Sequence, residues 1–147
     1  SSIMDRELIQ AKLESLRRCV QRIRDKTPAS AQILLDDFDL QDIISVNLER
    51  AVQLCVDIAA HLIADSKEAM PTTMADGFDI LQKLDIIPAE LALRLRKAVG
   101  FRNISVHAYQ EIDWEIVYAI ITSRLDDFTS LAQRVDALLQ ASEESDS

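Results

Sequence analysis

The stretch QDIISVNLERAVQLCVDIAAHLI, residues 41–63, decides the fold class. It contains no glycine or proline, and its apolar side chains cover much of a helix circumference rather than a single stripe. These side chains are Ile43, Ile44, Val46, Leu48, Val52, Leu54, Val56, Ile58, Leu62 and Ile63. A helix that is apolar on most of its sides is buried among other elements. We therefore predict a helix over about 40–66 at the centre of a helical bundle.

Amphipathic stretches before and after this segment supply the neighbours of the central helix. Pro28 ends an apolar stripe of helical spacing, an Asp-rich loop follows, and Asp113 caps the last long stripe. We predict five helices, over about 4–27, 40–66 and 73–84, from Pro88 into the segment that follows Gly100, and over about 113–140. Pro88 suits the first turn of its helix, where the missing N–H costs nothing.

The scarcity of turn-forming residues excludes a β-rich fold. Only two glycines and three prolines occur in 147 residues, and β-rich folds need many tight turns. We expect an all-α, up-and-down bundle of about five helices that forms one domain over 1–140, followed by a disordered acidic tail over 141–147. The third helix is too short to cover a full side of the bundle. An apolar face left open in this way favours a dimer.

The charge of the chain is strongly negative but unevenly distributed. A net charge of −9 argues against a protein that covers itself with nucleic acid, because such binding neutralises phosphates with cations. Residues 5–26 nevertheless carry seven basic side chains, and residues 94–102 carry four basic side chains and no acid. From charge alone, local RNA contact and solvated helix faces are equally good interpretations of these two runs.

Cysteine usage and hydropathy indicate the compartment. Cys19 and Cys55 fall within apolar helical patterns and have no metal-ligand spacing, which predicts reduced, buried thiols. Asp5, Arg6 and Glu7 interrupt any leader of the secretory kind, and no apolar stretch approaches the length that crosses a bilayer. We expect a cytoplasmic protein without membrane contact.

The segment RNISVHAY, residues 102–109, gathers the side chains that can carry chemistry. Arg102 supplies a permanent cation, Asn103 an amide, His107 an imidazole and Tyr109 a phenol. Since Asn103 and His107 are four residues apart, they share a helix face, and the amide is expected to orient the ring. Arg102 and His107 lie about 140° apart on an ideal helix. They can meet on one substrate across a groove edge, through a loosened helix end, or with the help of a second copy.

An arginine and a histidine acting without a metal ion suit the cleavage of RNA, because RNA carries its own nucleophile in the 2′-hydroxyl. His107 can remove that proton or protonate the leaving 5′-oxygen, and Arg102 can hold the phosphate through paired hydrogen bonds. No metal or cofactor is expected, since neither histidine belongs to a Glu-x-x-His pair and no zinc ligand set exists. From spacing alone, a structural role for His107 is the more common outcome.

The segment also resembles a known family. GFRN (100–103) followed by VHAY (106–109) resembles the signature of the HepT toxins, a branch of the HEPN ribonuclease superfamily: Arg, four residues, His, one residue, Tyr. LERAVQ, DIA and HLI within 48–63 are similar to the family's second helix. DIL and II within 79–87 are similar to its short helix and the following turn. The resemblance covers most of residues 4–135.

The resemblance implies a cytoplasmic homodimeric toxin that cleaves RNA, with tRNA a frequent target of the superfamily. It implies catalytic roles for Arg102 and His107, with Asn103 in support. It also implies a cognate antitoxin of the minimal nucleotidyltransferase type, which transfers AMP from ATP to Tyr109. A bulky anion on Tyr109 would occupy the phosphate site and pair with Arg102, so that RNA could not enter.

Polar and aromatic residues outside the motif have two possible interpretations. Asp57 either supports the active-site Arg or His from the central helix or belongs to a buried polar network that fixes helix register, and the two remain open. His61 is assigned to such a network. Trp114 and Tyr118 are expected in the core, because seven aromatic residues in all are too few for a base-stacking surface.

Two other functional classes remain open on the sequence. One is a non-catalytic helical subunit that binds a nucleotide or a partner within a nucleotidyltransferase complex, which would leave RNA intact. The other is a purely structural bundle, in which substitutions of Arg102 and His107 would change only stability.

Overall fold

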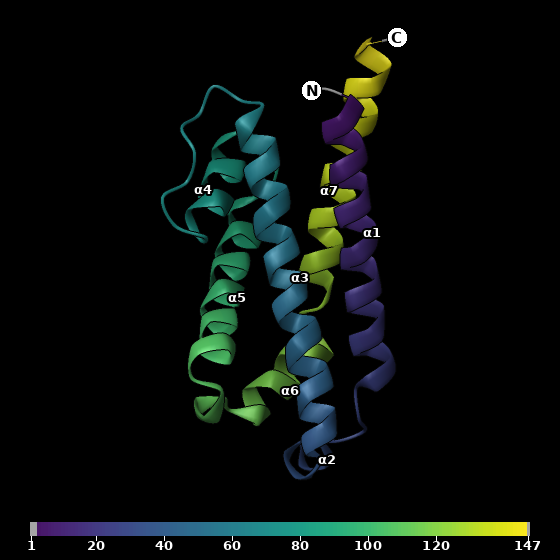
Figure 1. The fold of residues 1–147 in the computed structure, drawn as a ribbon, viewed down its shortest axis with the longest axis vertical. Coiled ribbons are helices and arrows are strands. Elements are labelled where there is room, and N and C mark those ends of the chain that lie inside the picture. The colour runs from purple at the N-terminus through teal and green to yellow at the C-terminus, as the bar shows by residue number, and fades with distance from the viewer. Residues whose placement is uncertain (1–2, 147) are drawn as a thin grey trace.

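The computed structural model describes residues 3–146, which contain helices and turns but no strand (Figure 1). The helices are α1 (Ile3–Lys26), α2 (Ala31–Asp36), α3 (Phe38–Ala64), α4 (Asp76–Lys83), α5 (Ala89–His107), α6 (Trp114–Ser123) and α7 (Asp126–Asp146), with the 3-10 turn η1 (Tyr109–Glu111) between α5 and α6. The predicted all-α class is confirmed.

The central position of α3 follows from its sequence. α3 buries side chains around its circumference, and α1 packs along one side of it while α4 and α5 pack along another (Figure 1). Leu48, Cys55 and Ile58 at its middle are at most 1% exposed. Burying a leucine or isoleucine side chain contributes roughly 1.5–3 kcal/mol. The prediction of a central helix over 40–66 is confirmed.

The long helices alternate in direction. Figure 1 shows α1 and α5 running toward the end of the bundle where α2 and α6 lie, and α3 and α7 running back. α7 packs beside α1, and α2 packs against α6. The turn after α5 therefore lies at the pole opposite the two chain ends, which Figure 1 marks close together.

One helix was missed by the sequence patterns. The segment between Pro28 and Phe38, expected to be a loop, contains α2. Ser30 caps it by accepting a hydrogen bond from the Ile33 N–H at 3.4 Å, and Leu34 is fully buried against the core. A helix of six residues is too short to show an apolar period, so its capping serine was the only available signal.

The predicted fifth helix is two helices, α6 and α7, which meet at Arg124. Before the break, the hydroxyls of Thr122 and Ser123 donate to carbonyl oxygens one turn back, at 2.7 and 2.5 Å. Such bonds compete with the helical ladder. After the break, Asp126 and Asp127 favour a new helix N-terminus through the macrodipole. The apolar seam runs on through both helices, which is why the sequence pattern suggested one.

The C-terminal segment also differs from expectation. Residues 141–146, expected to be disordered, continue α7 as far as Asp146. Arg6 Nη2 of α1 donates to Ser142 Oγ at 3.1 Å, which ties this end of α7 to the start of the chain. Residue 147, the remainder of the expected tail, lies outside the described residues.

The other general expectations can be compared directly. Cys19 and Cys55 are buried and free, as predicted, and burial raises the pKa of both thiols. Trp114 and Tyr118 pack against the core, also as predicted. Within residues 3–146, no helix combines the length and the apolar character that a membrane crossing needs.

Candidate active site

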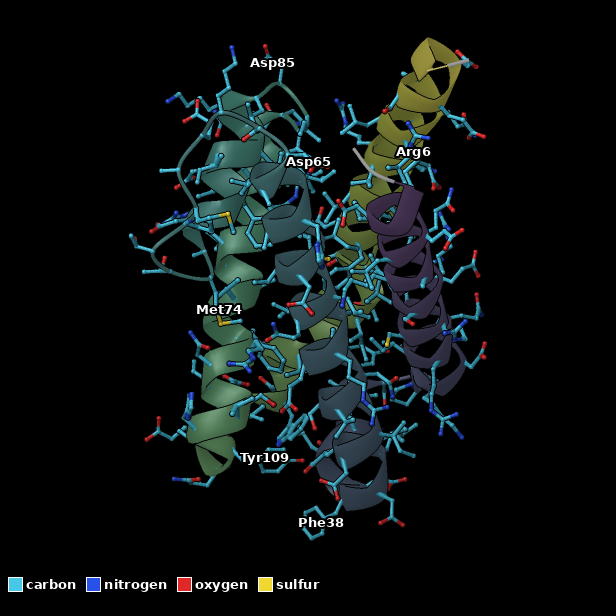
Figure 2. The ribbon with its side chains drawn as sticks, turned by 45° about the horizontal axis from the view of Figure 1, so that its top comes forward. Arg6, Phe38, Asp65, Met74, Asp85 and Tyr109 are labelled. Carbon is cyan, nitrogen blue, oxygen red and sulfur yellow. The ribbon has the colours of Figure 1, made fainter. Side chains whose placement is uncertain are left out.

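The segment 102–109 forms the last turns of α5 and the start of η1. Ala108 ends the helix: its N–H donates to Ile104 O at 2.8 Å, but its φ and ψ of −146° and 54° leave the helical region. Arg102 and His107 are therefore helical residues, whereas Tyr109 lies past the end of α5 (Figure 2). The chain turns here toward the N-terminal part of α3.

The side chain of Arg102 has neighbours that position it, but no acidic partner that neutralises its charge. Its Nη1 donates to Asn103 Oδ1 at 3.2 Å and lies 3.9 Å from the sulfur of Met74, which belongs to the loop before α4. Its Nε is buried and has no hydrogen-bond partner among the described residues, and no carboxylate there pairs with it. A buried donor without a partner costs roughly 1–3 kcal/mol, so this guanidinium has capacity to bind an anion.

Asn103 has a different partner from the one predicted. The four-residue spacing suggested that its amide orients the His107 ring, but its oxygen accepts from Arg102 instead. Side chains at adjacent positions meet here because the long arginine side chain can reach round the helix. Asn103 is thus placed to orient the cation of the segment.

His107 is the last residue of α5 and is exposed. Among residues 3–146, no side chain or backbone group forms a hydrogen bond with its ring. Both Arg102 and His107 lie in regular helix, so the angle of about 140° expected between them is preserved. Within one chain the two side chains point to different sides of α5.

Tyr109 is fixed from two directions. Its hydroxyl donates to Asp42 Oδ1 of α3 at 2.7 Å, and its ring packs edge-on against Trp114 of α6, with centroids 5.8 Å apart and planes at 66°. Burial raises the pKa of Tyr109, and the hydrogen bond to Asp42 together with the charges of Asp42 and Glu49 raises it further. At neutral pH this side chain is an un-ionised phenol.

A second contact to α3 was not predicted from the sequence. Ser105, at 3% exposure, donates its hydroxyl to Glu49 Oε1 of α3. Asp42, Ser45 and Glu49 follow one another at intervals of three and four residues, so they form one polar stripe on α3. The spacing of these three residues was the signal that could have revealed the stripe.

Asp57 does not lie with the motif. Its carboxylate accepts from Lys12 Nζ of α1 at 3.4 Å and from Gln53 Nε2 of its own helix at 2.9 Å. Of its two interpretations, the structure therefore favours the polar network between helices α1 and α3. Neither bond links Asp57 to Arg102 or His107, and spacing along α3 alone did not reveal which neighbouring helix its side chain faces.

The donor set offers no metal centre in the described part of the chain. No three His, Cys, Asp or Glu side chains gather there at a spacing that could hold a metal ion.

An apolar groove of about 640 Å³ runs beside the motif, between α5, α6 and the start of α7. Phe101, Ile104 and Ile116 line it, and Ile104 and Ile116 are 44% and 58% exposed. Gly100 also lines it, and a Cβ added there would meet no atom within 4 Å. Nothing inside the chain therefore explains a glycine in the middle of α5.

Known proteins resemble this chain over nearly all of its length. A family model described as ribonuclease HepT-like matches residues 13–135, which include the whole 102–109 segment. The mRNA nuclease HepT of Shewanella oneidensis is 34% identical over 131 residues, which cover 89% of this chain and 98% of that protein. The tRNA nuclease HepT of Aphanizomenon flos-aquae is 27% identical over 137 residues, 93% of each chain.

A solved structure matches equally well. The tri-AMPylated Shewanella oneidensis HEPN toxin in complex with MNT antitoxin superposes on this chain with a TM-score of 0.83 at 34% identity. The match covers 88% of this chain and 96% of that chain. The resemblance inferred from the motif thus extends to the whole fold.

Proposed function

The chain belongs to the HepT-like ribonuclease family, and from this premise we propose that Arg102 and His107 cut RNA without a metal ion. The observation that carries the proposal is the state of Arg102, a half-buried arginine whose buried Nε donor is unfilled and which has no carboxylate partner among residues 3–146. By contrast, Arg94 of the same helix pairs with Asp127 at 2.7 Å. His107 stands open to solvent five residues away.

The reaction follows from what the two side chains offer. The 2′-oxygen of the ribose attacks the neighbouring phosphorus, the bond from phosphorus to the 5′-oxygen breaks, and a 2′,3′-cyclic phosphate remains. Arg102 binds the phosphate oxygens and stabilises the charge that grows on them. His107 takes the 2′ proton or gives a proton to the leaving oxygen. DNA, which lacks the 2′-hydroxyl, is not a substrate.

The substrate we propose is tRNA. The two HepT relatives are an mRNA nuclease and a tRNA nuclease, so the family fold supports action on both classes. Digestion of purified tRNA and purified mRNA in parallel shows which of the two RNA classes this protein cleaves.

Free, buried thiols and the RNA substrate support a cytoplasmic location.

We propose a homodimer whose two chains share each catalytic site. Gly100, Asn103, Ile104 and His107 are all exposed, and their spacing of three and four places them on one outer face of α5. Because Gly100 has no side chain, the α5 helix of a second copy can approach closely at this position. Such packing brings the His107 of one chain toward the Arg102 of the other, which the angle within one helix does not allow.

The proposed regulator is a nucleotidyltransferase antitoxin that transfers AMP from ATP to Tyr109. The tri-AMPylated toxin in complex with MNT antitoxin, similar to this chain over its length, supports both the partner and the modification. Tyr109 is 38% exposed and lies two residues from His107, so an added AMP reaches the space where RNA must bind. Its phosphate is an anion of the kind that Arg102 can bind.

Incubation of the unmodified protein with total RNA in EDTA tests the proposed cleavage. We expect cleavage to persist in EDTA, with 2′,3′-cyclic phosphate ends, and His107→Ala to lower the rate by about 10²–10⁴. Loss of wild-type cleavage in EDTA contradicts the metal-free mechanism. RNA left intact by the wild type in magnesium as well supports the non-catalytic binding subunit instead.

Intact-mass measurement tests the proposed regulation. The protein incubated with its cognate antitoxin and ATP is expected to gain mass in units of AMP, and Tyr109→Phe to gain none. The gain should coincide with loss of RNA cleavage. A mass gain that persists in Tyr109→Phe places the modification elsewhere.

A further inference from the structure

Asp42 of α3 contacts the phenolic oxygen of Tyr109, the atom to which AMP would be attached. The Tyr109 hydroxyl donates to Asp42 Oδ1 at 2.7 Å across 67 residues of sequence. The Trp114 ring packed on Tyr109 limits how far the phenol can turn away. Figure 2 shows Tyr109 at the pole of the bundle where the N-terminal part of α3 lies. A carboxylate and a phenol are thus held together by two separate helices.

The carboxylate of Asp42 has no other task in the described part of the chain. No cation pairs with it and no other side chain donates to it there, whereas Oε1 of the nearby Glu49 accepts from Ser105. Asp42 is also exposed, so its second oxygen can be solvated. An unpaired carboxylate keeps its capacity to accept a proton.

The surroundings of Tyr109 make a base necessary for any reaction at its oxygen. Burial, the hydrogen bond to Asp42 and the charges of Asp42 and Glu49 raise the pKa of the phenol, while the Ser45 hydroxyl opposes them. Among the described residues, the charged groups that shift the pKa of Tyr109 are Asp42 and Glu49 of α3, and α6 contributes the uncharged Trp114 ring. A phenol that stays protonated is a weak nucleophile until a base removes its proton.

We propose that Asp42 is the general base for AMP transfer to Tyr109, so that this chain supplies part of the catalytic machinery for its own inactivation. The inference rests on the proposed modification of Tyr109. It assigns to the toxin a catalytic group that would otherwise have to come from the antitoxin. The hydrogen bond already joins the proton to its acceptor before ATP arrives.

The step balances as follows. Tyr109 Oη attacks the α-phosphorus of ATP, and an oxygen–phosphorus bond forms. The bond between the α-phosphorus and the oxygen bridging to the β-phosphate breaks, and pyrophosphate leaves with that electron pair. The phenolic proton passes to Asp42 Oδ1 as the new bond forms, and solvent later removes it. Because the phenol loses basicity only as the bond to phosphorus develops, transfer to a carboxylate is favourable at that stage and not before.

Rates of AMP transfer in the complex with the cognate antitoxin test the proposal. Asp42→Asn keeps an oxygen that can accept the hydrogen bond but cannot take a proton. We expect its rate of AMP transfer at saturating ATP and antitoxin to fall by about 10²–10⁴, with little change in KM for ATP. Asp39→Asn is the matched control, since it removes the same charge one turn away and does not act on Tyr109. It should react at the wild-type rate.

The pH profile separates a base from a structural support. Relative to Asp39→Asn, the Asp42→Asn rate should rise about tenfold per pH unit, because the reaction then depends on the small fraction of free phenolate. Asp42→Glu, which restores a carboxylate, should recover part of the rate and the original profile. Thermal unfolding of each variant verifies that the fold is intact.

Every other outcome contradicts the proposal. Asp42→Asn modified at the wild-type rate excludes Asp42 as the base, and faster modification makes it a lock that holds Tyr109 back. A slow Asp42→Asn reaction with an unchanged pH profile indicates a structural role only. A wild-type chain that gains no AMP, or a Tyr109→Phe chain that does, overturns the proposed function itself and is distinguishable from these results.

Discussion

Ser105 and Tyr109 are tied to α3 by Glu49 and Asp42, whereas Arg102 has no tie to that helix among the described residues. The segment is therefore anchored by its two hydroxyl side chains, one buried and one at the helix end. The cation and the imidazole between them stay available for substrate. This division explains how a short segment can be rigid and reactive at once.

The phenol of Tyr109 should titrate above the ordinary tyrosine pKa. In a Tyr118→Phe background Tyr109 is the only tyrosine, so absorbance near 295 nm against pH reports it alone. We expect its pKa to lie above about 10 and to fall when Asp42→Asn removes the neighbouring charge. An unchanged pKa in Asp42→Asn contradicts the hydrogen bond.

The same shift has a consequence for stability. A group whose pKa is raised by folding stabilises the folded state fully below its unfolded pKa, and this contribution is lost as pH rises through the folded pKa. Wild-type protein should therefore lose more stability above about pH 10 than Tyr109→Phe does. Urea midpoints measured between pH 8 and pH 11, at roughly half-unit steps, give the comparison.

The sequence could not predict which side chains of different helices contact one another at the site. The spacing located Arg102, His107 and Tyr109 on one segment, because neighbours along a helix follow from its period alone. The partner of Asp57 and the partner of Tyr109 lie 45 and 67 residues away along the chain. Those pairings depend on how whole helices pack, which a single sequence pattern does not contain.

Helix α5 carries an outer face that the rest of the chain leaves uncovered. Gly100 on that face lowers helix propensity by about 1 kcal/mol relative to alanine, and no atom within 4 Å of its missing Cβ requires it. Since nothing inside the chain requires glycine at this position, we attribute the loss of helix propensity to a contact with another molecule.

The boundaries of α3 and α5 could be predicted from their sequence patterns. The break between α6 and α7 could not, because it depends on hydroxyl-to-carbonyl hydrogen bonds, while the apolar seam runs on through both helices.

Gly100→Leu tests the outer face of α5. Gly100 is exposed and a Cβ there meets no atom within 4 Å, so we expect unchanged helix content by circular dichroism, loss of the dimer by sedimentation velocity, and cleavage reduced at least about tenfold. Gln133→Leu, which adds the same side chain to an exposed position of α7, should leave both unchanged. A Gly100→Leu protein that remains dimeric and active shows that two copies do not meet on this face.

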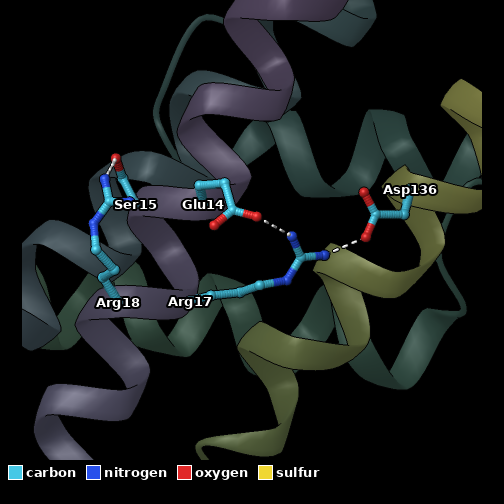
Figure 3. Close-up of polar contacts among 5 residues, drawn as sticks. All are labelled: Glu14, Ser15, Arg17, Arg18 and Asp136. Carbon is cyan, nitrogen blue, oxygen red and sulfur yellow. Dashed lines mark hydrogen bonds and ion pairs between the residues drawn. The ribbon is translucent and has the colours of Figure 1, made fainter.

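Over the whole molecule, the basic side chains of α1 are mostly committed to structure. Arg17 forms ion pairs with Glu14, at 3.5 Å, and with Asp136 of α7, and Arg18 donates to Ser15 (Figure 3). In the basic run 5–26, equally consistent with RNA contact from sequence, Arg17 and Arg24 thus join α1 to α7, and Lys12 joins it to α3. In the second run, Arg94 and Arg96 pair with acids, whereas Lys97 and Arg102 pair with no carboxylate among the described residues.

Mixing two inactive variants tests whether the catalytic site is shared between chains. If each site takes Arg102 from one chain and His107 from the other, a dimer of one Arg102→Ala chain and one His107→Ala chain has one complete site. Random exchange should then restore about a quarter of wild-type cleavage. Refolding the variants together and separately, followed by an RNA cleavage assay, gives the comparison. No recovery after verified exchange means that both side chains act from one copy.

The two chain ends lie together at one pole, joined by the bond from Arg6 to Ser142, while Tyr109 lies at the other pole (Figures 1 and 2). Polypeptide attached at either end therefore leaves the molecule from the side away from the motif. The protein can be immobilised on a sensor surface through such a tag with its reactive pole facing the solution. Arrival of RNA, of antitoxin and of AMP can then be followed on one oriented layer of molecules.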